Sequence, residues 1–483
     1  MNLLSSLNRF PDHVRHIHIM GVCGTGMGSL AGMLKDSGYV VTGSDENVYP
    51  PMSDFLASCN IEIKNGYSAE NLVPHPDLVV VGNTIRKTNP EAQALAELGI
   101  PYVSFPQALG HYFLANRTSL VVTGTHGKTT TSSLLATMLH KTGQTPGFMI
   151  GGLVQAFGRN YNLGDSPYFV VEGDEYDTAF FDKGPKFLHY QSHIAIVTSI
   201  EFDHADIFAD LEAIKDSFSR LMAIMPKDGC VVACFDSPVV QEIAAKAQCP
   251  ILSYGMDKGA EWSIRNLAVK PGTTYFDVMH KGMLYGTCKS PMPGRHNALN
   301  ALAVIAVLDR LGMDKEAIIA GLGSFEGIRR RQEVRGVVNN ITVIDDFAHH
   351  PTAVRETLTA LKQAYDGHRL VAVFEPRTNS SRRQVFQKEY VSAFDGADMV
   401  VLREPLPLPD FPAAQMFSSR QLALDLQDRS IDAFSFADTD DILSHLRTFL
   451  VPGDVVVILS NGGFDNIHAR LLEMLGERLR TED

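Results

Sequence analysis

The stretch "SLVVTGTHGKTTTSSLLATMLHK" (residues 119–141) decides the fold. Its first residues form an apolar run typical of a buried strand, and residues 129–141 have the composition of a helix. Between them, Gly127-Lys128-Thr129 match the end of the phosphate-binding pattern G-x-x-x-x-G-K-[ST], but Val122 stands where that pattern expects its first glycine. A strand, a glycine turn and a helix predict a phosphate-binding loop, because backbone N–H groups and the helix N-terminus attract anions. The alternative is a structural turn with an incidental lysine.

The same alternation of short apolar strands and amphipathic helices extends in both directions from this loop. It predicts an α/β protein of three domains: a Rossmann-like N-terminal domain, a central P-loop ATPase-type domain and a Rossmann-like C-terminal domain. We expect their bounds at residues 1–117, 118–331 and 332–483. Within the third, "VRGVVNNITVIDDF" predicts a hairpin that turns at Asn339-Asn340.

A second glycine-rich turn, "GVCGTGMGS", follows the strand predicted at residues 16–20. It departs from G-x-G-x-x-G, because Ser29 stands where the third glycine is expected. Asp45 ends the next strand about 20 residues further on, as the ribose-binding acid of a dinucleotide fold does. The pattern leaves three interpretations open: a nicotinamide cofactor, a nucleotide-sugar, or a tight turn without a ligand.

Acidic and polar groups follow several other predicted strands. "EGDEYD" contains Glu172, and "EFDHADIF" contains His204. "GRHNALNAL" places Asn297 and Asn300 three residues apart at a helix start, hence on one helix face. Each group has a plainer interpretation as a solvated loop or a helix cap. A triphosphate on the loop at residues 124–130 would need divalent cations, and this favours carboxylates as Mg²⁺ ligands.

Composition restricts the function further. The 483 residues are 45% hydrophobic and 20% charged, with a net charge of −13, which argues against a nucleic-acid partner. The six cysteines form no C-x-x-C pair and are expected to be reduced thiols of the core. With no signal peptide and no long apolar run, we expect a cytoplasmic protein without a membrane partner.

Taken together, these motifs resemble the Mur ligase family, whose members form amide bonds with ATP in bacterial peptidoglycan metabolism. "GVCGTGMGSLAGML" and "GSD" resemble the N-terminal domain of the members that bind UDP-N-acetylmuramate. "GRHNALNA", "RRRQE" and "DDFAHHPT" resemble motifs of the central and C-terminal domains, and G-T-x-G-K-T is the family's own form of the loop.

The resemblance implies the cofactors ATP and Mg²⁺ and assigns roles to individual residues. Catalytic roles fall to Lys128, Glu172, His204, Arg331 and Asp346. Thr129, Glu172 and His204 would hold metal ions. ATP would be bound by Gly124, Thr125, His126, Gly127, Lys128, Thr129, Thr130, Asn297, Asn300, Arg331, Asp346 and His349. The UDP-sugar would be bound by Gly21, Gly24, Gly26, Met27, Ser44 and Asp45. Several family members carry a carbamylated lysine, but Phe218 occupies that place here, so none is expected.

Within the family, "EGDEYDTAFFDK", "EPRTNS" and "SNGGFDNIH" are most similar to the branch that uses a recycled tripeptide. This implies joining UDP-N-acetylmuramate to L-Ala-γ-D-Glu-meso-diaminopimelate, with Arg377 and Asn379 binding the peptide. The chain is expected to be a monomer or weak homodimer. The nearer alternative is the same reaction with L-alanine. A nicotinamide-dependent dehydrogenase and a non-catalytic ATP-binding regulator are the more distant ones.

Overall fold

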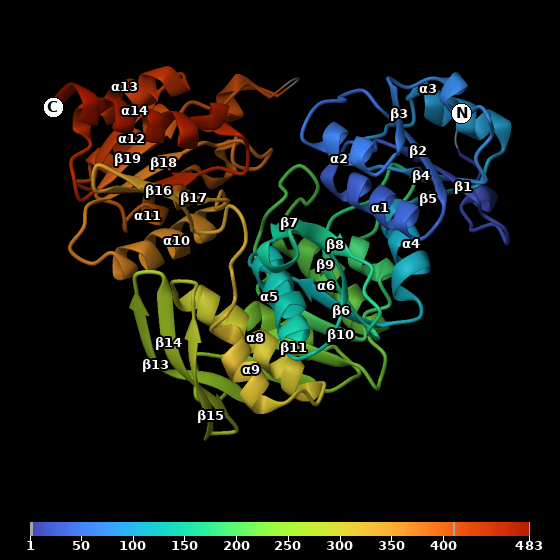
Figure 1. The fold of residues 1–483 in the computed structure, drawn as a ribbon, viewed down its shortest axis with the longest axis horizontal. Helices are drawn as coiled ribbons and strands as arrows, with labels where there is room; N and C mark the ends of the chain where they lie inside the picture. Colours follow the sequence, from blue (N-terminus) through green and yellow to red (C-terminus); the bar gives the residue numbers. More distant parts are fainter. Residues whose placement is uncertain (1–2, 409–410, 483) are drawn as a thin grey trace. The chain divides into compact units, whose positions relative to one another are not determined.

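The computed structural model describes residues 3–408 and 411–482. Its strands form three sheets with helices packed between and around them, and this confirms the α/β class (Figure 1). The chain groups into two compact units, Met1–Ile200 with Glu212–Ser253, and Glu201–Leu211 with Tyr254–Asp483. The three domain bounds expected from the sequence remain predictions.

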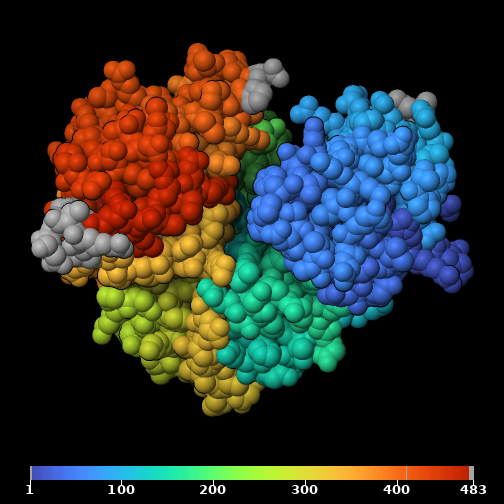
Figure 2. Space-filling view, turned by 45° about the horizontal axis from the view of Figure 1, so that its top comes forward, coloured from blue at the N-terminus to red at the C-terminus, as the bar shows by residue number. Residues whose placement is uncertain are grey.

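The first sheet is fully parallel and has the order β3-β2-β1-β4-β5, the order of a Rossmann-like domain. The β-branched run of β4 is buried on both faces, as parallel strands covered by helices require. The first glycine turn follows β1, which lies between β2 and β4 where the strand order reverses. The elements are β1 His16–Met20, α1 Thr25–Asp36, β2 Val40–Asp45, α2 Met52–Ser58, β3 Glu62–Asn65, β4 Leu78–Val81, α3 Pro90–Leu98, β5 Tyr102–Ser104 and α4 Phe105–Leu109. Figure 2 shows these residues, in blue, as one continuous body.

The second sheet contains the strand that precedes the phosphate-binding loop. In the first unit its strands have the order β11-β10-β6-β9-β7-β8, parallel except for β8. The phosphate-binding loop therefore follows a central strand, β6. These elements are β6 Thr118–Thr123, α5 Lys128–Lys141, β7 Gly147–Val154, β8 Arg159–Asn162, β9 Tyr168–Gly173, β10 Ile194–Val197, α6 Leu211–Ile224, β11 Cys230–Cys234, α7 Pro238–Ala244 and β12 Ile251–Gly255.

The loop after β9, residues 174–190, crosses from the second sheet to the first. Phe180 and Phe181 pack against the apolar core beside the first sheet, where Phe181 meets Tyr102 edge-on at 4.7 Å between ring centroids. Ser104 donates a hydrogen bond of 2.9 Å to Asp182. We call this loop the strap, and these contacts fix the position of its remaining side chains.

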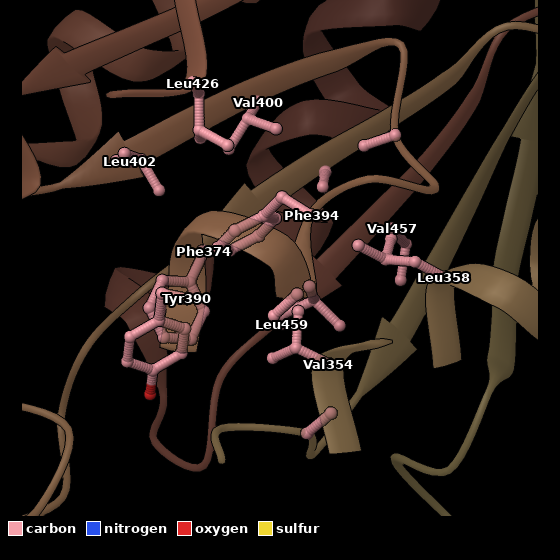
Figure 3. Packing of buried hydrophobic residues seen from close by; sticks show 14 of the residues in the cluster. Val354, Leu358, Phe374, Tyr390, Phe394, Val400, Leu402, Leu426, Val457 and Leu459 are labelled. Carbon is pink, nitrogen blue, oxygen red and sulfur yellow. The ribbon is translucent and has the colours of Figure 1, made fainter. Parts of the chain in front are cut away.

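The second unit contains the remaining strands of the second sheet, β13, β14 and β15, which pair antiparallel, together with helices α8 and α9 and the last, six-stranded sheet with its own helices. The last sheet has the order β16-β17-β21-β18-β19-β20 and is parallel apart from β16. Its elements and those before it are β13 Trp262–Lys270, β14 Thr273–His280, β15 Met283–Ser290, α8 Arg295–Arg310, α9 Lys315–Leu322, β16 Glu333–Val338, β17 Ile341–Asp346, α10 Pro351–Ala364, β18 Leu370–Phe374, α11 Gln387–Ala393, β19 Met399–Arg403, α12 Ser419–Gln427, β20 Asp432–Phe436, α13 Thr439–Phe449, β21 Val455–Leu459 and α14 Ile467–Glu482. Figure 3 shows one face of this sheet, where Phe374, Tyr390 and Phe394 fill the core.

The predicted hairpin turn is confirmed, whereas the prediction that the cysteines lie in the core is confirmed for four of the six. Asn339 and Asn340 both have positive φ (53° and 55°) and form the hairpin turn between β16 and β17. All six cysteines are free thiols; Cys23 and Cys59 are half-buried, whereas the other four are fully buried. Among the described residues, no helix combines the length and the apolar character needed to cross a membrane.

Candidate nucleotide-binding site

The phosphate-binding loop connects β6 to α5 through two glycines in conformations that disfavour side chains. Gly124 has φ +126°, and Gly127 has φ +80° and is the N-cap of α5. The N-cap position makes no side-chain hydrogen bond. The N-terminus of α5 therefore presents backbone N–H groups with a positive helix end, the arrangement that binds phosphate. The loop is also held by Ser199, which lies just after β10. Thr125 N donates a hydrogen bond to Ser199 O (2.9 Å), and His126 N donates one to Ser199 Oγ (3.0 Å).

Lys128 is the first residue of α5, and its ammonium group lies among acids. Its Nζ donates to Gly124 O (2.7 Å) and Glu175 Oε2 (3.2 Å), and Asp174 Oδ1 lies at 3.8 Å. Burial acts to lower the pKa of Lys128, but the charges of Glu175 and Asp174 outweigh it and raise that pKa. Lys128 is therefore charged at neutral pH, and its ammonium group is a cation of the kind that a bound triphosphate needs.

Glu172 is oriented toward the start of α5. Thr129 Oγ1 donates to Glu172 Oε2 (3.1 Å), and Gly151 N donates to Glu172 Oε1 (2.6 Å). A hydroxyl and a carboxylate at hydrogen-bond distance, beside a phosphate-binding loop, are hard oxygen donors of the kind Mg²⁺ prefers. The two residues fit a Mg²⁺ ion.

The first glycine turn is held by Asp45. Its Oδ2 accepts a hydrogen bond from Cys23 N (2.8 Å), and its Oδ1 accepts one from Asn47 N (2.9 Å). Gly24 is the N-cap of α1 and makes no side-chain hydrogen bond, so this helix also presents backbone N–H groups. Ser44 is fully buried and donates to Glu91 Oε1 (2.7 Å), which places its hydroxyl inside the domain.

A single cavity of about 1180 Å³ connects the first glycine turn to Glu172. Of the residues expected to bind the UDP-sugar, Gly21, Gly24, Gly26, Met27 and Asp45 line it. The other end is lined by Glu172, Asp174, Tyr176 and Lys186. A ligand with its anionic group on the first turn can therefore extend to the acid beside the phosphate-binding loop.

The remaining candidates belong to the second unit, and their relation to the loop stays a prediction. His204 lies in the segment Glu201–Leu211 and has φ 51°, unusual for a residue other than glycine. Neighbouring Asp203 is buried. Burial acts to raise its pKa, but His204, His350 and His349 outweigh it and hold the pKa at about 2. Asp203 is therefore a carboxylate at neutral pH, and its Oδ1 accepts a hydrogen bond from His204 N (2.6 Å).

Asn297 and Asn300 are both buried on α8. Asn297 Nδ2 donates to Pro293 O (2.8 Å), and Asn300 Nδ2 lies 3.5 Å from Asn297 Oδ1, so the two share a helix face as predicted. The N-cap of α8 is Gly294, so neither amide caps the helix.

Asp346, at the end of β17, accepts hydrogen bonds from the backbone N–H groups of Gln332 and Ala348, both at 2.8 Å. Burial raises its pKa, with Arg331 opposing. The Arg331 guanidinium lies over the Phe347 ring at 4.8 Å, and His349 Nδ1 lies 3.0 Å from Phe347 O. The structure thus gathers Arg331, Asp346 and His349 within one short region.

Arg377 and Asn379 follow β18. Arg377 is half exposed, with Nη1 3.6 Å from Glu375 Oε1, and Asn379 Nδ2 donates to Asp206 Oδ2 (2.9 Å). An accessible guanidinium suits a carboxylate ligand. Its role in peptide binding stays a prediction.

Sequence reasoning missed two side chains that the structure places at this site. Lys186 lies 12 residues beyond Asp174 and reaches it only through the fold of the strap. Glu91 sits under the first turn, although it follows no motif. The Asn89-Pro90-Glu91 helix start could have indicated Glu91, because acids favour the first turn of a helix.

The fold has three sheets covered by helices, a phosphate-binding loop, and a cavity that extends from a Rossmann-like turn to Glu172 beside that loop. These features are typical of a nucleotide-dependent α/β enzyme. Three family descriptions match the chain: "Mur ligase family, catalytic domain" at residues 16–117, "Mur ligase middle domain" at 122–308 and "Mur ligase, glutamate ligase domain" at 329–462. The chain belongs to the Mur ligase family, and it is an ATP-dependent ligase that forms amide bonds.

Individual proteins similar to this chain indicate which kinds of Mur ligase it resembles. A UDP-N-acetylmuramate–L-alanyl-γ-D-glutamyl-meso-2,6-diaminoheptandioate ligase of Haemophilus influenzae is 41% identical over 96% of this chain and 99% of its own. A UDP-N-acetylmuramate–L-alanine ligase of Clostridium tetani is 33% identical over 94% of this chain and 97% of its own. The crystal structure of a murein peptide ligase from Psychrobacter arcticus is 36% identical, covers 96% of this chain and 99% of its own, and has a TM-score of 0.70.

Proposed function

We propose that this enzyme joins the carboxylate of UDP-N-acetylmuramate to the α-amine of L-Ala-γ-D-Glu-meso-diaminopimelate, with ATP as the energy source, in the recycling of peptidoglycan. The relatives that act on this tripeptide support the acceptor, since they exceed the alanine ligase in identity. One observation carries the proposal: the cavity that runs from the first glycine turn to Glu172. In this cavity the sugar nucleotide would bind by its diphosphate at the first glycine turn, with its acid beside Glu172.

The chemistry follows from the poor reactivity of a carboxylate toward an amine. Family resemblance implies that the sugar's carboxylate oxygen attacks the γ-phosphorus of ATP, forming a P–O bond as the bond to ADP breaks. The amine then attacks the acyl carbon of this mixed anhydride, a C–N bond forms, phosphate leaves and the amine loses a proton. Both steps bring anions together, so cations must offset the repulsion.

We assign this offset first to Lys128, whose ammonium stabilises the transferred phosphoryl group. Thr129 and Glu172 would hold one Mg²⁺, which would neutralise phosphate charge when bound. His204 would hold a second ion. The predicted contacts with ATP are retained for Asn297, Asn300, Arg331, Asp346 and His349. Peptide binding is retained for Arg377 and Asn379. We also retain the expectation of a monomer or weak homodimer, which sedimentation velocity tests.

The proposal is tested with purified protein, ATP, Mg²⁺, UDP-N-acetylmuramate and one acceptor at a time. We expect ADP release and a product of the summed mass, less water, with the tripeptide, and far slower turnover with L-alanine. Turnover with L-alanine and none with the tripeptide would reverse the acceptor assignment. A reaction lacking the sugar nucleotide is the control for background ATP hydrolysis.

A further inference from the structure

Four charged side chains pack behind the phosphate-binding loop, and we call them the charged quartet: Lys128, Asp174, Glu175 and Lys186. Asp174 lies in the middle and uses one oxygen toward each lysine. Its Oδ2 is 2.9 Å from Lys186 Nζ, and its Oδ1 is 3.8 Å from Lys128 Nζ. Glu175 pairs with Lys128 at 3.2 Å. Two cations and two anions make the quartet formally neutral.

Lys186 is held in place by the strap. Its side chain is only 16% exposed, and its ammonium lies 4.3 Å from the centroid of the Tyr176 ring and 5.9 Å from that of Phe105. It starts a short 3-10 helix directly after Pro185, which limits backbone movement. The ammonium is thus a fixed charge beside Asp174.

Lys128, in contrast, has to change partners. Its ammonium is turned back to Gly124 O and the two acids, whereas a bound triphosphate requires it to point at phosphate oxygens. When it leaves, Asp174 would remain as a mostly buried carboxylate, and an unpaired buried charge is strongly unfavourable. The pair with Lys186 removes this difficulty for Asp174, so that Glu175 remains the one acid of the quartet that Lys128 must leave.

We infer that Lys186 is a positioning residue: by neutralising Asp174, it prevents that carboxylate from trapping Lys128 and so releases the lysine to ATP. The inference rests on the nucleotide-binding role of Lys128 within the proposed function. Lys186 itself contacts no reacting atom in this account. Because Lys186 also lines the cavity, its removal should weaken ATP binding clearly more than it weakens binding of the sugar nucleotide.

The test measures the Kd of Mg-ATP and of UDP-N-acetylmuramate separately by calorimetry. Lys186→Met should weaken ATP binding by about tenfold or more, because one buried carboxylate loses its fixed partner. The double variant with Asp174→Asn should restore ATP affinity to within about threefold of the parent, since the trap is removed together with its counter-ion. Lys183→Met is the matched control on the same strap. Its surface pair with Asp177 is exposed, so we expect a change within about twofold.

Three outcomes would overturn the inference: unchanged ATP affinity in Lys186→Met, equal losses in the single and double variants, or an equal loss of UDP-sugar affinity. If Lys186→Met does not fold, the double variant decides, since it removes both charges of the pair and should keep ATP affinity within about threefold of the parent, whereas a tenfold loss would refute the trap. Because ATP binding is measured without an acceptor, a failure of tripeptide ligation would count against the proposed function and not against this inference.

Discussion

The two glycine-rich turns of the first unit follow the same plan but are supported by different chemistry. Each follows a strand in the middle of a parallel sheet and opens a helix whose N-cap makes no side-chain hydrogen bond. The first turn is held by Asp45, which accepts two backbone N–H groups. The second has an ammonium, Lys128, among acids. The first turn is therefore held in one conformation by hydrogen bonds. The second turn contains an ammonium group, Lys128, that can exchange its acidic partners for phosphate oxygens.

The side chains packed beneath the two turns also differ. Beneath the first turn, the Glu91 carboxylate is fully buried and accepts hydrogen bonds from Ser44 (2.7 Å) and Asn71 (2.6 Å), with His18 Nε2 at 2.9 Å. Beneath the second lies the charged quartet, in which Asp174 faces two cations. Burial acts to raise the pKa of Asp174, but Lys186 and Lys128 outweigh it and lower the pKa to about 2. The comparison suggests that binding and catalysis are assigned to separate turns.

The largest expected effect comes from removing the exchangeable charge. Lys128→Ala should lower the rate of ADP release by about a hundred- to a thousandfold, because a preorganised charge on the transferred phosphoryl group is lost. The affinity for UDP-N-acetylmuramate should stay unchanged if the first turn binds it independently. A coupled assay for ADP and calorimetry measure the two quantities.

Lys183→Ala serves as the control for this variant, since Lys183 is exposed and pairs only at the surface of the strap. A Lys128→Ala enzyme that keeps a tenth of the parental rate would remove the phosphate-binding loop from the mechanism. A loss of UDP-sugar affinity would contradict the division of roles between the turns.

A smaller effect, and one confined to binding, should come from adding a methyl group to either turn. At Gly124 (φ +126°), a Cβ would lie 2.2 Å from Thr198 Oγ1 and 2.8 Å from Ser199 N, so the loop must move. Gly124→Ala should weaken ATP binding by about tenfold or more, since both strain and clash act there. At Gly28, a Cβ would meet Met52 Sδ at 2.9 Å and the backbone atom Val22 O at 3.2 Å. The flexible Met52 side chain can yield, and the contact with Val22 O needs a shift of only a few tenths of an ångström.

Gly28→Ala should therefore weaken UDP-sugar binding by only about two- to fivefold and leave ATP binding alone. Calorimetry with each nucleotide in both variants tests the contrast. An ATP defect in Gly28→Ala, or a UDP-sugar defect in Gly124→Ala, would show that the turns are not independent.

The same contrast explains what the sequence could predict. The strand–turn–helix at residues 119–141 was predictable because its apolar run, its glycines and Lys128 are adjacent in the chain. The pairing of Thr129 with Glu172 was also within reach, because both follow parallel strands and so meet at one sheet edge. Lys186 was not, since its position depends on Phe180 and Phe181 docking the strap onto the first sheet. No local pattern encodes such a long-range contact.

Ser44 shows the opposite limit. Its place at the end of β2 favoured a ligand contact in the sequence, but the side chain is fully buried against Glu91. Alternation along a strand decides which of two neighbours points to the cavity, and Asp45 lines it instead. A prediction that names consecutive residues after a strand therefore includes one that faces inward.

The smallest expected effect on activity comes from the layer under the first turn. Glu91→Gln replaces one carboxylate oxygen by an NH₂ group. On the Oε2 side this group would face two donors, Asn71 Nδ2 and Ser68 N, and on the Oε1 side it would require the Ser44 hydroxyl or His18 Nε2 to change from donor to acceptor. A buried donor left without an acceptor costs about 1–3 kcal/mol of unfolding free energy. We expect a lower melting temperature and UDP-sugar affinity reduced by about two- to fivefold, because Ser44 precedes Asp45 and the turn loses some of its rigidity.

Thermal unfolding and calorimetry measure these two changes, with ATP affinity as the internal control. Gln93→Glu, on the exposed side of the same helix, is the matched surface change and should alter the free energy of unfolding and both binding free energies by no more than about a few tenths of a kcal/mol. If Glu91→Gln weakened ATP binding as much as UDP-sugar binding, the hydrogen-bonded layer would support both turns. The first glycine turn and the phosphate-binding loop would then depend on each other, and the proposed separation of binding from catalysis would fail.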